Sequence, residues 1–397
     1  MTNPTSSTEH VSYLVIGAGL SGAAAAWRLA QSGADVVVVE RDVPASHLGS
    51  SHGSARIFRY AYADPFYVDL VVRARSSWDE LESASGRRLI TPSGSLDFGS
   101  VRDPRGLADA LGTVGVPHEL LSRTDAENRW PQLRFDTEVL WHADAGVIDA
   151  ESAVHAMLDL ACAAGAELRT GWEAASVRRA STGYTVTSTT GAAVTAGQVI
   201  VAAGGWLPAL LADLDIPSGF RAALPSFEVR QENAFHFPYR AAEDGGATAA
   251  DERTSWPTFI YKGDDIQMYS LPGGRDADFA GQKIAEYNGG RTIGSAREQD
   301  GVIDPQNRER VRGFVGEFVP GLETTPYAEA TCLFTNVPRD DMIIDRAEGI
   351  TILSPCSGQG AKFAPLLGEL VYDLVAGSGR SGERFRADGQ RFAEAAR

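Results

Sequence analysis

Apolar positions in the first forty residues follow the order of a strand, a helix and a second strand. The run at 11–16 is β-branched and apolar, residues 23–31 are strong helix formers, and the valines at 36–39 form a second buried-type strand. Buried strands joined by a helix are typical of a parallel sheet. The pattern therefore predicts that the chain begins an α/β domain.

Helical and strand periodicities alternate through the rest of the chain. Helices are predicted at 66–83, 101–114, 151–164 and 361–375. Strands are predicted around 89–98 as a hairpin, and at 139–142, 166–189, 198–205, 329–335 and 342–353. From about 220 to 322 the pattern changes to strands with polar loops, which include an acidic insertion at 241–255.

This change of pattern predicts two interleaved domains. The strand at 198–205 is apolar enough to return to the first sheet, so residues 13–90, 145–219 and 325–378 are assigned to a Rossmann-type dinucleotide-binding domain. Residues 91–144 and 220–324 are assigned to an antiparallel-sheet substrate domain, which makes the fold a mixed α/β and α+β arrangement. We expect a disordered lead at 1–12 and a polar tail at 379–397.

Composition excludes several classes of partner. The chain has 397 residues and a net charge of −16, which argues against nucleic acid and acidic membranes because both require basic surface. No stretch is apolar and long enough to span a membrane, and residues 1–10 do not resemble a secretory signal. Three cysteines give no disulfide framework and fit a reducing compartment. We expect a cytoplasmic monomer that binds a small molecule and no metal.

A glycine turn lies between the first strand and the first helix. The segment from Gly17 through Gly19 to Gly22 fits G-x-G-x-x-G, in which the glycines allow a tight turn and close approach of a pyrophosphate. Glu40 ends the second strand 21 residues after Gly19, where its carboxylate can accept hydrogen bonds from ribose hydroxyls. These features predict a dinucleotide site, and the motif alone does not separate FAD from NAD.

Other candidate residues have two interpretations from the sequence alone. Gly358 and Gly360 open the last helix, either as an anion-binding helix start beneath a flavin or as a plain turn. Arg56 and Arg59 share a face if their segment is helical and point apart if it is extended. These arginines and Lys362 are either solvated or part of the basic pocket that an anionic substrate would need inside an acidic protein.

Several segments together resemble the monomeric sarcosine oxidase and N-methyltryptophan oxidase family, within the D-amino-acid-oxidase-like flavoproteins. The resemblance extends from about residue 13 to residue 377. It rests on the glycine turn and on the segments 51–59, 128–131, 201–206, 331–335 and 357–363. It implies a Rossmann-type FAD-binding domain and an oxidase activity on amines that carry a carboxylate.

The resemblance also implies roles for individual residues. FAD would be attached through the sulfur of Cys332 to the flavin 8α carbon, and Lys283 would assist the reaction with O₂. Arg59 and Lys362 would bind the substrate carboxylate, and Tyr269 would line the substrate pocket. The residues expected to contact FAD are Gly17, Gly19, Gly22, Glu40, Arg41, Ser51, His52, Arg56, Gly204, Cys332, Gly358, Gln359, Gly360 and Lys362.

Four departures from the family pattern lie around the amine and the pocket wall. Tyr287 stands where the family has a histidine near the amine, and Phe334 where it has a tyrosine. Gln359 replaces a histidine in the final glycine turn, and Ala55 replaces a threonine. The carboxylate anchor is kept while the wall changes, so a substrate bulkier than sarcosine is plausible.

The sequence therefore predicts an FAD-dependent oxidase of a carboxylate-bearing secondary amine, which releases H₂O₂. The open alternatives are an oxidase of primary or glycated amino acids on the same scaffold, and a flavin dehydrogenase with another electron acceptor. A further alternative from another class is a nicotinamide-binding or regulatory protein without catalysis.

Overall fold

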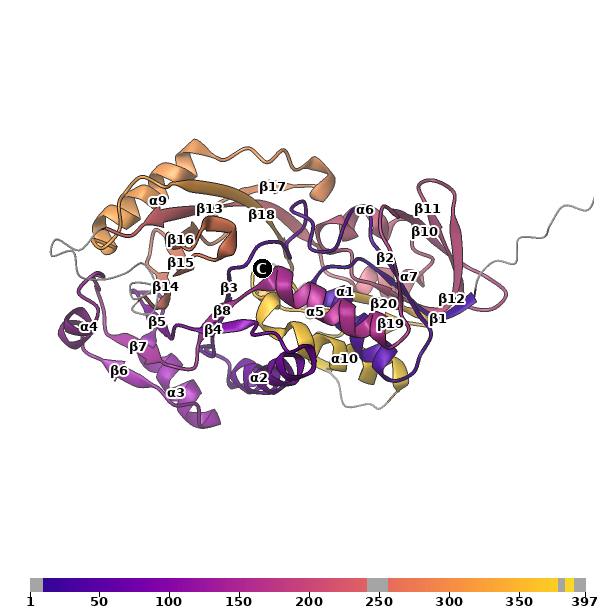
Figure 1. Ribbon diagram of the computed structural model, residues 1–397, viewed down its shortest axis with the longest axis horizontal. Helices are drawn as coiled ribbons and strands as arrows, with labels where there is room; N and C mark the ends of the chain where they lie inside the picture. The colour runs from indigo at the N-terminus through magenta and orange to yellow at the C-terminus, as the bar shows by residue number, and fades with distance from the viewer. Residues whose placement is uncertain (1–9, 241–255, 378–382, 389–397) are drawn as a thin grey trace, which may run out of the picture.

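Two large sheets lie side by side along the long axis of the molecule (Figure 1). The computed structural model describes residues 10–240, 256–377 and 383–388. Most of the predicted lead, the acidic insertion at 241–255 and most of the tail lie outside the described residues. Within the described part, no helix combines the length and the apolar composition that crossing a bilayer requires.

The first sheet begins with the predicted strands and has the order β10-β11-β12-β1-β2-β9. β1 pairs in parallel with β2 and β12. β20 pairs in parallel with the last three residues of β12, Val199 to Val201. The strands are β1 (His10–Ile16), β2 (Val36–Val39), β9 (Glu167–Arg169), β10 (Ala174–Arg179), β11 (Tyr184–Ser188), β12 (Ala193–Val201), β19 (Ile343–Ala347) and β20 (Ile350–Ser354).

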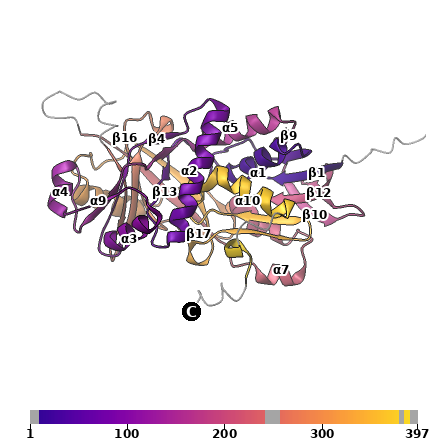
Figure 2. The same ribbon diagram turned by 90° about the horizontal axis from the view of Figure 1, so that it is seen from below.

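Alternating valines explain why this sheet is covered on both faces. Val36 and Val38 pack against the helices of one core, while Val37 and Val39 pack into a second core on the opposite face. The helices of the first core are α1 (Leu20–Gln31), α2 (Pro65–Ser85), α3 (Pro104–Val114), α5 (Ala150–Ala163) and α10 (Ala364–Ala376). α1 packs against both α5 and α10, and α2 packs against both α10 and α3, so α2 crosses from one half to the other (Figure 2).

The second sheet is largely antiparallel and has the order β17-β13-β16-β15-β14-β5-β7-β6, with β18 also on β13. Its strands are β5 (Ser95–Phe98), β6 (Glu119–Leu121), β7 (Val139–His142), β13 (Glu228–Pro238), β14 (Thr258–Lys262), β15 (Gln267–Pro272), β16 (Gly281–Glu286), β17 (Arg291–Ile293) and β18 (Ala328–Asn336). A small sheet, β3 (Arg56–Phe58), β8 (Gly146–Ile148) and β4 (Ile90–Pro92), lies between the two large ones.

The other helices are α4 (Arg123–Arg129), α6 (Leu207–Leu211), α7 (Ser218–Ala223) and α9 (Pro305–Phe318). Short 3₁₀ turns occur at η1 (Gly204–Trp206), η2 (Arg275–Ala277), η3 (Ala296–Glu298), η4 (Pro338–Asp340), η5 (Gly360–Phe363) and η6 (Glu383–Phe385). α9 buries Val311, Phe314 and Val315 against one face of the second sheet, which leaves the opposite face for the site.

Three details differ from the sequence expectations. Residues 89–98 do not form a hairpin, because β4 pairs with β8 and β5 pairs with β7 and β14 in another sheet. The helix α9 lies in a region expected to hold strands and loops. The sequence did not predict it because the helix has few apolar positions and a charged surface. β18 pairs with β13 along its length, so this strand belongs to the second sheet although its chain position grouped it with the first.

Candidate active site

Two cavities meet between the two large sheets. The first is lined by the glycine turn, by residues 39–51 and by residues 202–206, and the second is a cavity of about 400 Å³ beside the second sheet. The residues that line both cavities are Arg56, Cys332, Phe334, Gly358, Gln359 and Ala361. A long ligand that fills the first cavity therefore ends at the wall of the second.

The glycine turn is a backbone cradle that only glycine can form. Gly17 has φ +102°, and a Cβ on it would lie 2.5 Å from the carbonyl oxygen of Ala202. A Cβ on Gly22 would lie 1.9 Å from the carbonyl oxygen of Gly17, so this glycine sets the close packing of α1 on the turn. Gly22 does not line the cavity, whereas Gly17 and Gly19 do.

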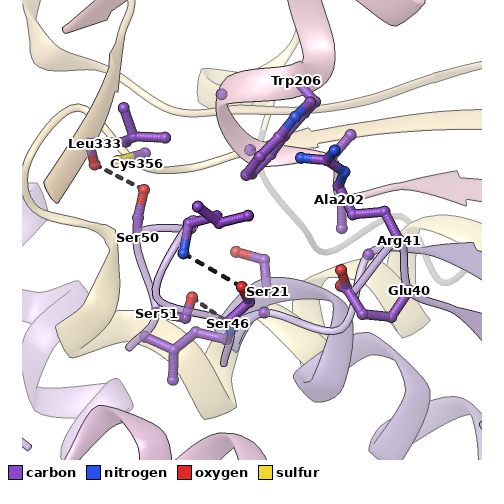
Figure 3. A pocket seen from close by; sticks show the side chains of 18 of the residues that line it. Ser21, Glu40, Arg41, Ser46, Ser50, Ser51, Ala202, Trp206, Leu333 and Cys356 are labelled. Atoms are coloured by element: carbon purple, nitrogen blue, oxygen red, sulfur yellow. Dashed lines mark hydrogen bonds between the residues drawn. The ribbon is translucent and has the colours of Figure 1, made fainter. Parts of the chain in front are cut away.

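The predicted acid Glu40 lies in the wall of the first cavity (Figure 3). Its Oε2 accepts a hydrogen bond from the N–H of Ala18 at 2.7 Å, and its Oε1 accepts one from Asp42 at 3.1 Å. A carboxylate has about four acceptor positions, so two remain for a ligand. Ser51 holds the following loop to the start of α1, because its hydroxyl accepts from the N–H of Leu20 at 3.0 Å.

Arg41 and Trp206 lie next to each other in the wall of the same cavity (Figure 3). The Arg41 guanidinium lies 4.6 Å from the centre of the Trp206 ring, and its Nε is buried without a hydrogen-bond partner. Gly204 lines the cavity one turn before the tryptophan. At the other end, the hydroxyl of Ser50 donates to the carbonyl oxygen of Leu333 at 2.7 Å, which ties the loop to β18.

One face of the second sheet carries the predicted chemistry. Residues that are paired across neighbouring strands point to the same face. Tyr269 of β15 is paired with Ile260 of β14. Two residues further along β15, Leu271 is paired with Lys283 of β16. These four residues, together with Cys332 of β18, line the second cavity. The strand period, and no local motif, therefore collects these side chains from distant segments.

Lys283 is buried on this face and is only 7% exposed. Burial, and next the neighbouring Arg56, lower the pKa of Lys283 to about 8. Its Nζ lies 3.5 Å from the carbonyl oxygen of Ala55. His236 is its cross-strand neighbour on β13, and burial followed by the charge of Lys283 lowers the pKa of this histidine to about 4.

The turn η2 and the residues around it pack against the segment that precedes Arg56. The carboxylate of Asp276 accepts hydrogen bonds from the N–H of Ser54 at 3.0 Å and from its hydroxyl. Burial alone would raise the pKa of Asp276, but these hydrogen bonds and the charge of Lys283 outweigh it and lower the pKa to about 2. The turn therefore adds a fixed carboxylate near Lys283, which the sequence did not indicate.

Arg59 and Lys362 both lie close to the Tyr62 ring. The Arg59 guanidinium is 4.8 Å and the Lys362 ammonium 5.5 Å from the centre of this ring, and both side chains line the second cavity. Lys362 donates to the carbonyl oxygen of Gln359 at 2.8 Å, and burial together with the charge of Arg59 lowers its pKa well below the usual value. Neither cation forms an ion pair with a carboxylate of the described residues.

The extended alternative holds for the arginine pair. Arg56 lies in the strand β3 and donates to the carbonyl oxygens of Ala55 at 2.9 Å and Ser50 at 3.0 Å, between the two cavities. Arg59 lies just beyond the strand and reaches only the second cavity. Both arginines therefore line the second cavity, and Arg56 also lines the first.

Tyr287 follows β16 and lines the second cavity. Its ring centre lies 5.9 Å from that of Phe334, and its hydroxyl lies 3.4 Å from the carbonyl oxygen of Ser357. Gly358 has φ +66°, and a Cβ on it would lie 2.9 Å from both aromatic rings. The final glycine turn therefore packs closely against Tyr287 and Phe334, two of the residues that depart from the family pattern.

Cys332 lies where the cavities join, and its sulfur is a free thiol in the structure. Burial raises the pKa of this thiol, while the charges of Arg56 and Lys283 act in the opposite direction. Gly360 lines the first cavity and begins η5, so a 3₁₀ turn precedes the last helix, which begins later than expected. Two of the predicted residues, Gly22 and His52, line neither cavity.

The sequence did not single out several residues of the second cavity. Tyr62, Arg102, Lys262 and Asp340 line it, and Asp97 lies buried behind Arg102. Nothing in their local sequence marks them, because each is one polar residue in an otherwise ordinary strand or loop. A period-2 comparison of β14 with β15 would have placed Lys262 on the face of Tyr269.

The site fits FAD on grounds that the structure itself provides. The cradle has no room for a Cβ, Glu40 keeps acceptor capacity, and buried nitrogens of Arg41 and Trp206 in the cavity wall have no partner within the described residues. The second cavity provides room for a small substrate beside the inner end of the first. The fold and site therefore define a dinucleotide-dependent enzyme with a separate substrate cavity.

The chain belongs to the family described as FAD dependent oxidoreductase, whose sequence profile matches residues 12–374. It is 31% identical over 378 residues to the monomeric sarcosine oxidase of Streptomyces avermitilis, and the alignment covers 91% of this chain and 92% of that protein. It is 28% identical to the N-methyl-L-tryptophan oxidase of Yersinia pestis, with 90% of this chain and 93% of that protein covered. It is therefore an FAD-dependent oxidoreductase.

Solved structures agree on the fold. NikD, an amino acid oxidase essential for nikkomycin biosynthesis, superposes with a TM-score of 0.82 at 24% identity, and 96% of this chain and 98% of that chain are covered. L-proline dehydrogenase from P. horikoshii superposes with a TM-score of 0.79 at 21% identity, with 98% and 99% covered. The predicted mixed α/β architecture with a Rossmann-type FAD-binding part is confirmed.

Proposed function

We propose that this protein is an oxidase of secondary amines that carry a carboxylate, such as N-methyl or other N-substituted amino acids. One observation carries the proposal: Arg59 and Lys362 converge on Tyr62 in a cavity that joins the nucleotide cavity at Cys332. Both curated relatives described above are named for N-methyl amino acids as substrates, sarcosine and N-methyl-L-tryptophan.

The two cations act as a carboxylate anchor. Each charge-assisted hydrogen bond to a carboxylate contributes about 1.5–3 kcal/mol. Because Arg59 and Lys362 have no carboxylate partner of their own in the described chain, a substrate carboxylate replaces water and relieves their mutual repulsion. The anchor fixes the substrate so that the carbon next to the amine faces the junction of the two cavities.

The walls around the amine exclude water without supplying a base. Tyr269 and Tyr287 line this part of the cavity, and burial raises the pKa of both phenols far above neutrality. Neutral phenols cannot accept the amine proton at pH 7, so the amine binds in its unprotonated form. Their contribution is burial and orientation.

Bound FAD would supply the two-electron acceptor for the C–H bond next to the amine. The overall reaction is R–NH–CH₂–R′ + O₂ + H₂O → R–NH₂ + R′–CHO + H₂O₂. Oxidation converts the amine into an imine, and water hydrolyses the imine to the two products. Lys283 holds a positive charge against the junction, where it stabilises the negative charge that forms as O₂ is reduced. An N-methyl substrate yields formaldehyde and an N-carboxymethyl substrate yields glyoxylate.

We also propose that Cys332 carries the cofactor covalently. Its thiol lies in the walls of both cavities, beside Arg56 and Lys283, whose charges favour the thiolate. Forming the bond replaces the S–H and one C–H of the flavin 8-methyl group by a C–S bond, and O₂ takes up the two electrons and two protons as H₂O₂.

We also propose, from the composition alone, that the protein is a monomer in the cytoplasm.

A substrate screen tests the oxidase proposal. The purified holoenzyme is supplied with N-methyl, N-carboxymethyl, glycated and primary amino acids in air, and H₂O₂ is measured with a peroxidase-coupled dye. We expect peroxide with N-substituted amino acids and little with primary ones. Peroxide from glycated or primary amino acids alone would favour the first alternative, a relative with another pocket.

Anaerobic reduction separates the oxidase from a dehydrogenase. If substrate bleaches the flavin without air and oxygen then restores its colour within one turnover, the enzyme is an oxidase. Bleaching followed by slow recovery in air, and fast recovery with a quinone or a protein acceptor, would identify the dehydrogenase instead.

A further inference from the structure

The second cavity holds more positive charge than one carboxylate can balance. Eight cationic side chains line it: Arg56, Arg59, Arg102, Lys262, Lys283, Arg339, Lys362 and Arg384. Among the described residues, the carboxylates that line it are Asp64 and Asp340. In a protein with a net charge of −16, this reversal of sign is local to the cavity.

Half of these cations have other tasks. Arg56 and Lys283 lie at the junction with the nucleotide cavity. Arg384 forms an ion pair with Asp64 at 2.5 Å, and Arg339 lies 3.9 Å from the carboxylate of Asp341. Four cations remain in the interior of the substrate cavity: Arg59, Arg102, Lys262 and Lys362. They face Asp340 in the wall and Asp97 behind it.

Arg102 is a fixed cation that extends the carboxylate anchor. Its Nε donates to the carboxylate of Asp97 at 2.7 Å, and Asp97 is fully buried. Its other nitrogen donates to the carbonyl oxygen of Ala61 at 3.1 Å, and Arg59 donates to the same oxygen. The two guanidiniums therefore meet at one carbonyl, so positive charge extends from the anchor toward β5 and β14.

Lys262 is the next cation along that face. Ile260 of β14 is paired with Asp97 of β5, and Lys262 lies two residues further along β14, on the same face. Its Nζ lies 5.7 Å from the centre of the Tyr287 ring and forms no ion pair with a carboxylate of the described residues. Burial, followed by the charges of Arg102 and Arg59, lowers the pKa of Lys262.

The two carboxylates do not cancel this charge. Four cations against Asp97 and Asp340 leave an excess of two, and burial raises the pKa of Asp340, which weakens its negative charge further. One substrate carboxylate serves Arg59 and Lys362 at the anchor and leaves Lys262 without an ion-paired carboxylate in the described part of the chain. Burial lowers the pKa values of Lys262 and Lys362, so each lysine keeps its proton best with a carboxylate beside it. A second substrate carboxylate beside Lys262 would supply that counter-charge.

We propose that the substrate is an N-substituted amino acid with a second carboxylate, and that Lys262 binds this second group while Arg102 adds positive charge behind it. The inference rests on the proposed function, because Arg59 and Lys362 hold the first carboxylate. It narrows the substrate to N-substituted amino dicarboxylates. Lys262 is then the residue that sets specificity, since a site built for a charged group rejects the neutral analogue.

A matched pair of substrates tests this with the holoenzyme. N-methylglutamate and N-methylglutamine have nearly the same size and differ in the charge of the second group, and both enantiomers are assayed for H₂O₂. We expect kcat/KM to be about 10- to 100-fold higher for N-methylglutamate, with the difference mainly in KM. Equal kcat/KM values for the two would overturn the inference.

Three variants locate the effect. Lys262→Met is expected to raise the KM for N-methylglutamate to that for N-methylglutamine and to leave the KM for N-methylglutamine within about threefold, whereas Lys262→Arg keeps the preference. Gln267→Met alters the cross-strand neighbour of Lys262 without a loss of charge, so it should change both KM values alike. If Lys262→Met changes both substrates equally, Lys262 does not contact the second carboxylate, and the inference is wrong.

Binding of compounds that cannot be oxidised separates this inference from the oxidase proposal. Pentanedioate and butanoate are titrated into the holoenzyme, and the perturbation of flavin absorbance gives Kd for each. Tighter binding of pentanedioate that Lys262→Met abolishes supports the second carboxylate site even if no amine yields peroxide, in which case only the oxidase proposal fails. Equal binding of both acids overturns the inference whatever the substrate screen shows.

Discussion

The two cavities that meet at Cys332 are built in different ways. One stretch, residues 16–51, supplies the glycine turn, Glu40 and Ser51 of the nucleotide cavity, and the segments 202–206, 332–334, 353–356 and 358–361 also form part of its wall. The substrate cavity is formed by side chains from at least four segments, among them Arg59, Lys262, Lys283 and Lys362. The cradle depends on a backbone conformation that only glycine allows, whereas a few charged side chains decide which substrate the other cavity accepts.

The largest effect is expected from a change in the cradle. Gly22→Ala places a Cβ 1.9 Å from the carbonyl oxygen of Gly17, so the turn cannot close on the helix, and we expect protein without FAD and with a lower Tm. The flavin content is read from absorbance at 450 nm.

Gly313→Ala is the matched control, because Gly313 is also a helix glycine and a Cβ on it meets no heavy atom within 4 Å. This variant should bind FAD normally and gain about 0.5–1 kcal/mol of stability. Full FAD content in Gly22→Ala would mean that the cradle is more adaptable than its geometry indicates.

Removing the charge at the junction should slow one half of the reaction. Lys283→Met is expected to reduce the rate of flavin reoxidation by O₂ about 10²- to 10³-fold, because the fixed positive charge is lost. Stopped-flow reduction under anaerobic conditions should stay close to that of the parent protein, which serves as the internal control. An unchanged reoxidation rate would contradict the role of this lysine.

The same lysine gives a pH dependence whose direction is fixed. Its pKa is lowered to about 8, so the charged fraction falls as pH rises through that value. Reoxidation by O₂ should therefore slow above pH 8 in the parent protein. In the Lys283→Met variant, the reoxidation rate measured by stopped flow at a series of pH values should not fall in this way above pH 8.

Changing the anchor should affect substrate binding and leave the cradle intact. Arg59→Met is expected to raise KM about 10- to 100-fold, which corresponds to one charge-assisted contact, with normal FAD content. Arg105→Met removes an exposed arginine that pairs with Glu138 on the surface at 2.6 Å, and it should leave KM unchanged. Equal KM values in the two variants would remove Arg59 from the substrate site.

The smallest effect on turnover is expected at the junction thiol. Cys332→Ser should release flavin on acid precipitation and retain much of its turnover with added FAD, since the cradle still binds the nucleotide. Cys356→Ser changes the other cysteine in the wall of the nucleotide cavity and should keep its flavin fluorescence on a denaturing gel. Acid-stable flavin in Cys332→Ser would assign the attachment elsewhere.

Most of the residues that the resemblance singled out line one of the two cavities. Arg59, Lys362, Tyr269, Tyr287, Lys283 and Cys332 all line the substrate cavity. The resemblance missed Lys262, Arg102 and Asp340, because these positions carry no motif and acquire meaning only from their neighbours. The helix α9 and the pairing of β18 were missed for a related reason, since tertiary packing and not local periodicity decides them.

The sequence by itself determined the nucleotide-binding half. Its strand, turn and helix follow one another in the chain, and the backbone conformation at Gly17 and the close approach at Gly22 exclude other residues. Only the tertiary structure decided the substrate half, because its charges come from strands and loops up to three hundred residues apart along the chain. The balance of positive and negative charge in this cavity depends on the distances between these side chains and on their burial. No single stretch of sequence determines either of these.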